Sequence, residues 1–66
     1  MKVQVMFFKP SGKFYTEETV HMNNDLQPWE VLPVLHDQLG GRMASMIAVI
    51  MNPPWGYPTL VPEVGS

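Results

Sequence analysis

The sequence contains no cysteine among its 66 residues. Disulfide bonds, thiolate zinc sites and cysteine nucleophiles are therefore excluded, and the absence of cysteine fits a reducing cytoplasm. The two histidines, His21 and His36, are too few to form a zinc site by themselves. A domain of this length buries only about 60% of its unfolded surface, and small domains compensate with disulfides, metal ions or self-association. We therefore expect one domain, residues 1–66, that forms a homo-oligomer without a metal ion or cofactor.

Charge is also scarce, because only 15% of the residues are Asp, Glu, Lys or Arg, and the net charge is −2. Nucleic-acid binders carry a basic face that neutralises phosphates, and the four cations of this chain do not form one. No run of apolar residues approaches the roughly 20 residues that span a bilayer, and the chain begins with a strand-like alternation rather than a targeting segment. These absences favour a cytoplasmic protein that binds neither membranes nor nucleic acid.

Residues 1–8 and 14–22 predict two strands that are joined by the turn Lys9-Pro10-Ser11-Gly12-Lys13. Proline presets φ at the first central position of the turn, and glycine takes the left-handed conformation that closes a hairpin with a bulge. A three-residue loop of this kind pairs Lys9 with Lys13. It also pairs Phe8 with Phe14 and Phe7 with Tyr15.

This pairing places apolar side chains on both faces of the hairpin. One face carries Val3, Val5, Phe7 and Tyr15, and the other carries Met6, Phe8, Phe14, Val20 and Met22. One short helix is too narrow to cover both faces, so a second copy must cover one of them. We predict that the oligomer interface consists of Met6, Phe8, Phe14 and Val20.

Residues 26–39 are helix-like but contain two prolines. Asp25 is a suitable N-cap, and Pro28 fits a first turn, whereas Pro33 would remove a hydrogen bond from a helix begun there. We therefore expect a short turn at residues 28–30, then a helix from Pro33 to about Leu39 that ends at Gly40-Gly41.

Residues 45–51 predict a buried central strand, since residues 46–50 are apolar without alternation. Residues 57–61 either return as a short edge strand or leave the sheet with three strands. The expected fold is α+β: a small antiparallel sheet of three to four strands with one short helix, in the order ββαβ or ββαββ.

Residues 52–55 (Asn-Pro-Pro-Trp) resemble the catalytic loop of amino-group DNA methyltransferases. Those enzymes also need a doubly wound domain with a glycine-rich loop, and this chain has neither the length nor the loop. Glu17 and Glu18 point to opposite faces of a strand, so they cannot act together on one substrate. No serine has a base at a recognisable spacing, and we therefore expect no enzymatic activity.

Two binding hypotheses follow from the side chains that remain. The first is that Trp55 and Tyr57, on a proline-stiffened loop, anchor a partner protein. The second is a nucleotide sponge, in which a pocket between protomers stacks a base on aromatics while Lys9, Lys13 or Arg42 meet phosphates. A single-strand nucleic-acid binder that uses the sheet aromatics is disfavoured by the acidic balance.

The segments 7–16 (FFKPSGKFYT) and 53–58 (PPWGYP) resemble those of small uncharacterised proteins encoded by bacteriophages of actinobacteria. The resemblance carries no residue roles. It implies a protein of the host cytoplasm that binds and blocks a host component, such as a defence factor, or sequesters a nucleotide signal molecule.

Overall fold

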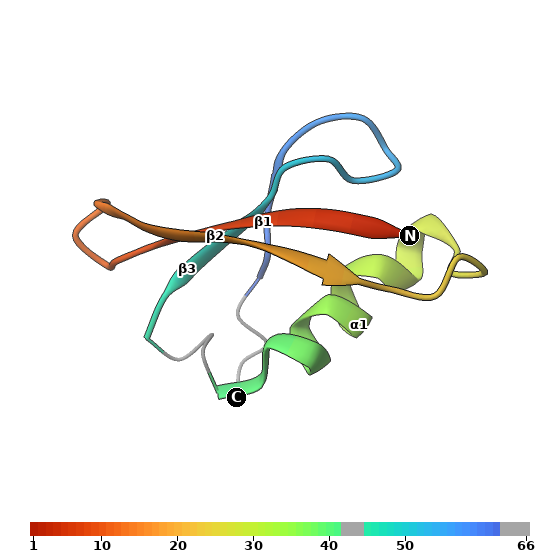
Figure 1. The fold of residues 1–66 in the computed structure, drawn as a ribbon, viewed down its shortest axis with the longest axis horizontal. Coiled ribbons are helices and arrows are strands. Elements are labelled where there is room, and N and C mark those ends of the chain that lie inside the picture. Colours follow the sequence, from red (N-terminus) through yellow and green to blue (C-terminus); the bar gives the residue numbers. More distant parts are fainter. Residues whose placement is uncertain (42–44, 63–66) are drawn as a thin grey trace.

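The computed structural model of the protein describes residues 1–41 and 45–62. Along the chain lie β1 (Lys2–Phe8), β2 (Phe14–His21), α1 (Pro28–Leu39), β3 (Ile47–Ile50) and β4 (Thr59–Leu60). The strands form one antiparallel sheet in the order β2-β1-β3-β4, with α1 on one side of it (Figure 1). The predicted α+β class is confirmed in its ββαββ form.

The hairpin turn has the predicted geometry. The Gly12 N–H donates to the Lys9 carbonyl oxygen at 2.8 Å, and the Lys9 N–H donates to the Lys13 carbonyl oxygen at 2.8 Å. Gly12 has φ 93°, in the left-handed region that glycine adopts without strain. Phe8 lies opposite Phe14, as the turn chemistry predicts.

The predicted pairing of Phe7 with Tyr15 is wrong. A bulge shifts the register beyond Phe8, so that Phe7 lies opposite Thr16 and Val3 lies opposite Val20. Because side chains alternate along a strand, one extra residue moves every later side chain of β2 to the other face.

The two faces of the hairpin therefore differ from the prediction. Met22 is buried in the core, and Val20 packs against the core. Neither residue therefore lies on the face with Met6 and Phe8, where the prediction placed them. Tyr15 is exposed at the bulge instead of lying with Phe7 in the core. We call the face of Val3, Val5 and Phe7 the inner face, and the opposite face the outer face.

The core lies between the inner face and α1. Its buried side chains come from β1, α1, β3 and the residues that directly follow β2 and β4: Val3, Val5, Phe7, Met22, Val31, Leu35, Leu39, Ala48, Ile50 and Val61. The helix contributes one stripe at helical spacing, Val31, Leu35 and Leu39. Glu17 and Glu18 lie on opposite faces, as predicted, since Glu18 is opposite the buried Val5 and Glu17 is opposite Met6.

The predicted break in the helix does not occur. Pro28–Leu39 is one continuous helix that contains Pro33, and its N-cap is Gln27 rather than Asp25. The Glu30 carboxylate accepts the Gln27 N–H at 2.9 Å, whereas the Asp25 N–H donates to the Asn23 side chain in a local turn. The helix ends at Gly40 with φ 58°, which confirms the predicted stop.

Pro33 is tolerated because it lies on the exposed side of α1. Proline lacks the N–H that would donate to the carbonyl four residues earlier, at Trp29, and that carbonyl lies on the same exposed side. The continuous helix places its whole apolar stripe on the sheet, and this burial offsets the lost hydrogen bond.

Replacing Pro33 with alanine is therefore expected to stabilise the protein by about 1–3 kcal/mol, since it restores an i to i−4 hydrogen bond. Pro28→Ala is the matched control, because a proline at the first helical turn interrupts no bond. Urea unfolding curves of the two variants measure the difference. Equal midpoints would contradict the continuous helix.

The C-terminal strands confirm part of the prediction. β3 is central, between β1 and β4, but its side chains alternate: Ala48 and Ile50 are buried, whereas Ile47 is exposed. The prediction that both faces of this strand are buried is therefore wrong. β4 forms the edge strand, between Pro58 and Pro62, and its two residues pair with Val49 and Ile50.

Candidate functional site

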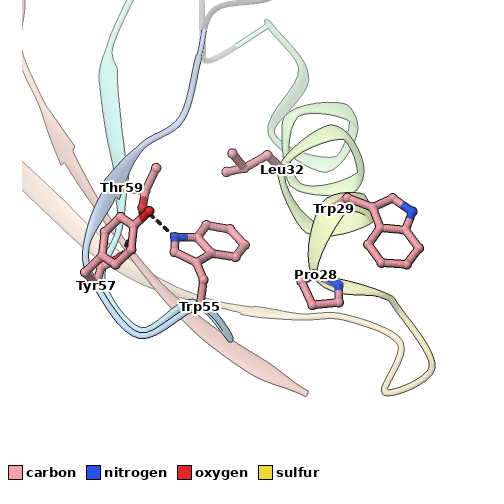
Figure 2. Close-up of a pocket in the computed structure, with 6 residues that line it drawn as sticks. All are labelled: Pro28, Trp29, Leu32, Trp55, Tyr57 and Thr59. Atoms are coloured by element: carbon pink, nitrogen blue, oxygen red, sulfur yellow. Dashed lines mark hydrogen bonds between the residues drawn. The ribbon is translucent and has the colours of Figure 1, made fainter.

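An open cleft of about 350 Å³ lies between the first half of α1 and the loop that joins β3 to β4 (Figure 2). Six residues line it: Pro28, Trp29, Leu32, Trp55, Tyr57 and Thr59. None of these lining side chains is charged at neutral pH. The cleft therefore suits an uncharged, largely apolar ligand that offers flat surface to aromatic rings.

The β3–β4 loop is attached to β1 by its first residues. The Asn52 side-chain oxygen accepts the Gln4 N–H at 2.7 Å, and the Met51 N–H donates to the Gln4 carbonyl oxygen at 2.8 Å. Asn52 thus continues the β1–β3 ladder with its side chain, a structural use of the amide oxygen. Pro53 is buried, and the Gly56 N–H closes the following turn by donating to the Pro53 carbonyl oxygen at 3.0 Å.

Trp55 is held in place by hydrogen bonds within the loop. Its Nε1–H donates to Thr59 Oγ1 at 2.6 Å, and the Thr59 hydroxyl donates to the Tyr57 carbonyl oxygen at 3.0 Å. The half-buried indole also packs against the core. Figure 2 shows the ring between Thr59 and α1, on the loop side of the cleft. The indole is therefore oriented before any ligand arrives.

Trp29 and Tyr57 are the two most exposed aromatic residues of the cleft, 75% and 64% exposed respectively. The indole of Trp29 points outward from α1 at the rim (Figure 2). Trp29 and Leu32 were not predicted as binding residues, because a break before Pro33 separates them from the helix. A continuous helix from Pro28 places both in its first half, with Leu32 toward the cleft and Trp29 at the outer rim (Figure 2).

The predicted cations do not join the aromatics. Lys9 and Lys13 lie at the tip of the β1–β2 hairpin, whereas the loop bonds to Gln4, about 17 Å further along β1. Figure 1 shows the hairpin tip and the β3–β4 loop at different ends of the sheet. Arg42 lies outside the described residues. Within one copy, Lys9 and Lys13 therefore cannot contact a ligand in the cleft.

The outer face carries an apolar area that we call the outer patch: Met6, Phe8, Phe14, Ile47, Val49 and Leu60. The register places these side chains together, since Met6 is opposite Val49, Phe8 is opposite Ile47, and Val49 is opposite Leu60. The rings of Phe8 and Phe14 meet edge to face, with centroids 6.0 Å apart.

Only three of the four predicted interface residues belong to the outer patch, because Val20 lies on the inner face. The additional members from β3 and β4 could not be assigned without the register. Phe14 is 54% exposed and Leu60 is 59% exposed. The rest of the outer face is polar and carries Gln4, Glu17 and Thr19, where the Thr19 hydroxyl donates to Gln4 Oε1 at 3.0 Å.

Among the described residues, no group of three or more His, Asp or Glu side chains is placed to hold a metal ion. The described part of the chain also has no helix with the length and apolar character needed to cross a membrane. None of the protein-family models, curated proteins or solved structures compared with this chain matches it.

Proposed function

We propose that this protein is a non-catalytic binding protein that holds an apolar, uncharged segment of a partner protein in the aromatic cleft. The observation that carries the proposal is the cleft itself, in which Trp55 is oriented by its bond to Thr59, Tyr57 lies beside it, and Trp29 is exposed at the opposite rim. Trp and Tyr are enriched among the residues that dominate protein–protein binding energies.

A preoriented ring loses little conformational freedom on binding, so more of its contact energy appears as affinity. The indole of Trp55 is restrained by a hydrogen bond and by the core, and Pro53 and Pro54 stiffen the loop that carries it. The uncharged lining disfavours a charged ligand, whose desolvation would not be compensated there.

The resemblance to small phage proteins makes the proposed partner a host component, such as a defence factor, whose activity is blocked when the cleft is occupied. Self-association through the outer patch is part of the proposal, because these partly exposed apolar side chains gain from burial against a second copy.

The test uses variants at the rim of the cleft, where substitutions leave the core intact. Trp29→Ala and Tyr57→Ala should each weaken the binding of a partner captured from host lysate and then purified by at least tenfold, as measured by titration calorimetry. Tyr15→Ala is the control, since Tyr15 is also exposed but lies at the hairpin bulge. Equal affinity in all three variants would overturn the role of the cleft.

A nucleotide ligand is the alternative, since the aromatic rings of the cleft can stack a base. Lys9 and Lys13 could meet its phosphates only from a second copy, because they lie at the far end of the sheet. Thermal unfolding with linear and cyclic nucleotides separates the two functions. A stabilisation that Tyr57→Ala abolishes would favour the nucleotide and would contradict the protein partner.

A further inference from the structure

The sheet has two edges of very different length. β4 is a two-residue edge between two prolines, which protects it from pairing with other strands. β2 is an eight-residue edge without proline, and no strand of the described residues pairs with its outward side. An edge of this kind is a template for another strand.

The hydrogen bonds on β1 identify which groups of β2 point outward. The Met22 N–H donates to the Met1 carbonyl oxygen, so Met1 and Met22 form a hydrogen-bonded pair. Such pairs alternate with non-hydrogen-bonded pairs along an antiparallel ladder. Gln4 and Thr19 are the third pair after Met1 and Met22, so they form a non-hydrogen-bonded pair. In agreement, the N–H and C=O of Gln4 bond on the other side, to Asn52 and Met51.

Glu17, Thr19 and His21 consequently direct their backbone N–H and C=O groups away from β1. We infer that this edge pairs with β2 of a second copy in an antiparallel arrangement, with the two Thr19 residues facing each other at a two-fold axis. Glu17 of each copy then lies opposite His21 of the other. About six hydrogen bonds join the copies, and the two sheets become continuous.

Side-chain charges favour this register over the two that move the axis toward the start of β2. With Thr19 at the axis, the Glu17 carboxylate can accept a hydrogen bond from the opposite His21 ring, and Glu18 faces Val20. Moving the axis to Glu18 places two like charges directly opposite each other, and moving it to Glu17 does the same. Like charges in direct cross-strand pairs are destabilising.

This inference goes beyond the proposed function, because it uses neither the cleft nor the outer patch. It is tested with Thr19→Cys, since the chain has no other cysteine. Facing residues of a hydrogen-bonded pair lie about 5.5 Å apart between Cα atoms, within the range of a disulfide. Under mild oxidation, Thr19→Cys should form a covalent dimer at least tenfold faster than Lys13→Cys, whose thiol lies at the exposed hairpin tip.

A second pair of variants separates the effect of the backbone hydrogen bonds at Thr19 from the effect of its side chain. Thr19→Pro removes the outward N–H, whereas Thr19→Val keeps it, and both remove the hydroxyl that bonds Gln4. Sedimentation should show self-association at least tenfold weaker for Thr19→Pro than for Thr19→Val. Equal cross-linking rates for the two cysteine variants would overturn the edge pairing. Equal self-association of Thr19→Pro and Thr19→Val in sedimentation would overturn it as well. Leu60→Ser, in the outer patch, should leave the rate of cross-linking through Thr19→Cys unchanged.

Discussion

Replacing Leu35 with alanine is expected to remove most of the stability of the protein. Leu35 is fully buried at the centre of the stripe that α1 places on the sheet. Truncating a buried leucine to alanine costs about 2–5 kcal/mol, because the cavity that remains collapses only in part. A domain of this length has a total stability of about 3–10 kcal/mol.

Urea unfolding followed by circular dichroism measures this loss, with Leu32→Ala as the matched control. Leu32 carries the same side chain on the same helix but is only half-buried, so we expect its truncation to cost about 1 kcal/mol. If both variants lost the same stability, α1 would not dock through Val31, Leu35 and Leu39.

The double substitution Phe14→Ser with Leu60→Ser is expected to weaken self-association through the outer patch more than 100-fold. Both side chains are more than half exposed in one copy, and burial of each against a neighbour contributes about 1 kcal/mol. A two-fold interface contains each residue twice, so the two substitutions together remove about 4 kcal/mol.

Analytical ultracentrifugation over a range of concentrations tests this expectation. Trp29→Ala is the control, because it removes a larger exposed apolar side chain from α1, away from the outer patch. A wild-type protein that stays monomeric at high micromolar concentration would refute self-association through either surface. A double variant that associates as strongly as the wild type would exclude the outer patch as an interface and would leave pairing through the β2 edge in place.

The hairpin turn was predictable because its conformation depends on the residues within it. Pro10 restricts φ, and Gly12 takes a left-handed φ that other residues rarely adopt, so Lys9 and Lys13 meet whatever the rest of the chain does. The stop of α1 at Gly40 is equally local. The stretch between Pro58 and Pro62 could be read as a short edge strand for the same reason.

The aromatic cleft was only partly predictable. The rigid loop with Trp55 and Tyr57 is visible in the run of prolines and aromatics, but its other wall requires α1 to begin at Pro28. The outer patch likewise needs the pairing of β3 with β1 and β4, which brings Ile47 beside Phe8 and places Val49 between Met6 and Leu60. Such contacts between strands that are separated in the sequence leave no local signal in the chain.

Short-range chemistry in the chain therefore specifies the turn, the helix stop, the α+β class and the lack of thiol chemistry, since each depends on backbone preferences or on composition. Packing decides three other features. These are the bulge at Tyr15, the continuous helix through Pro33, and which side chains lie on the inner and outer faces of the sheet. Burying Met22 and the stripe of Val31, Leu35 and Leu39 in one core outweighs an interrupted ladder and a missing helical hydrogen bond.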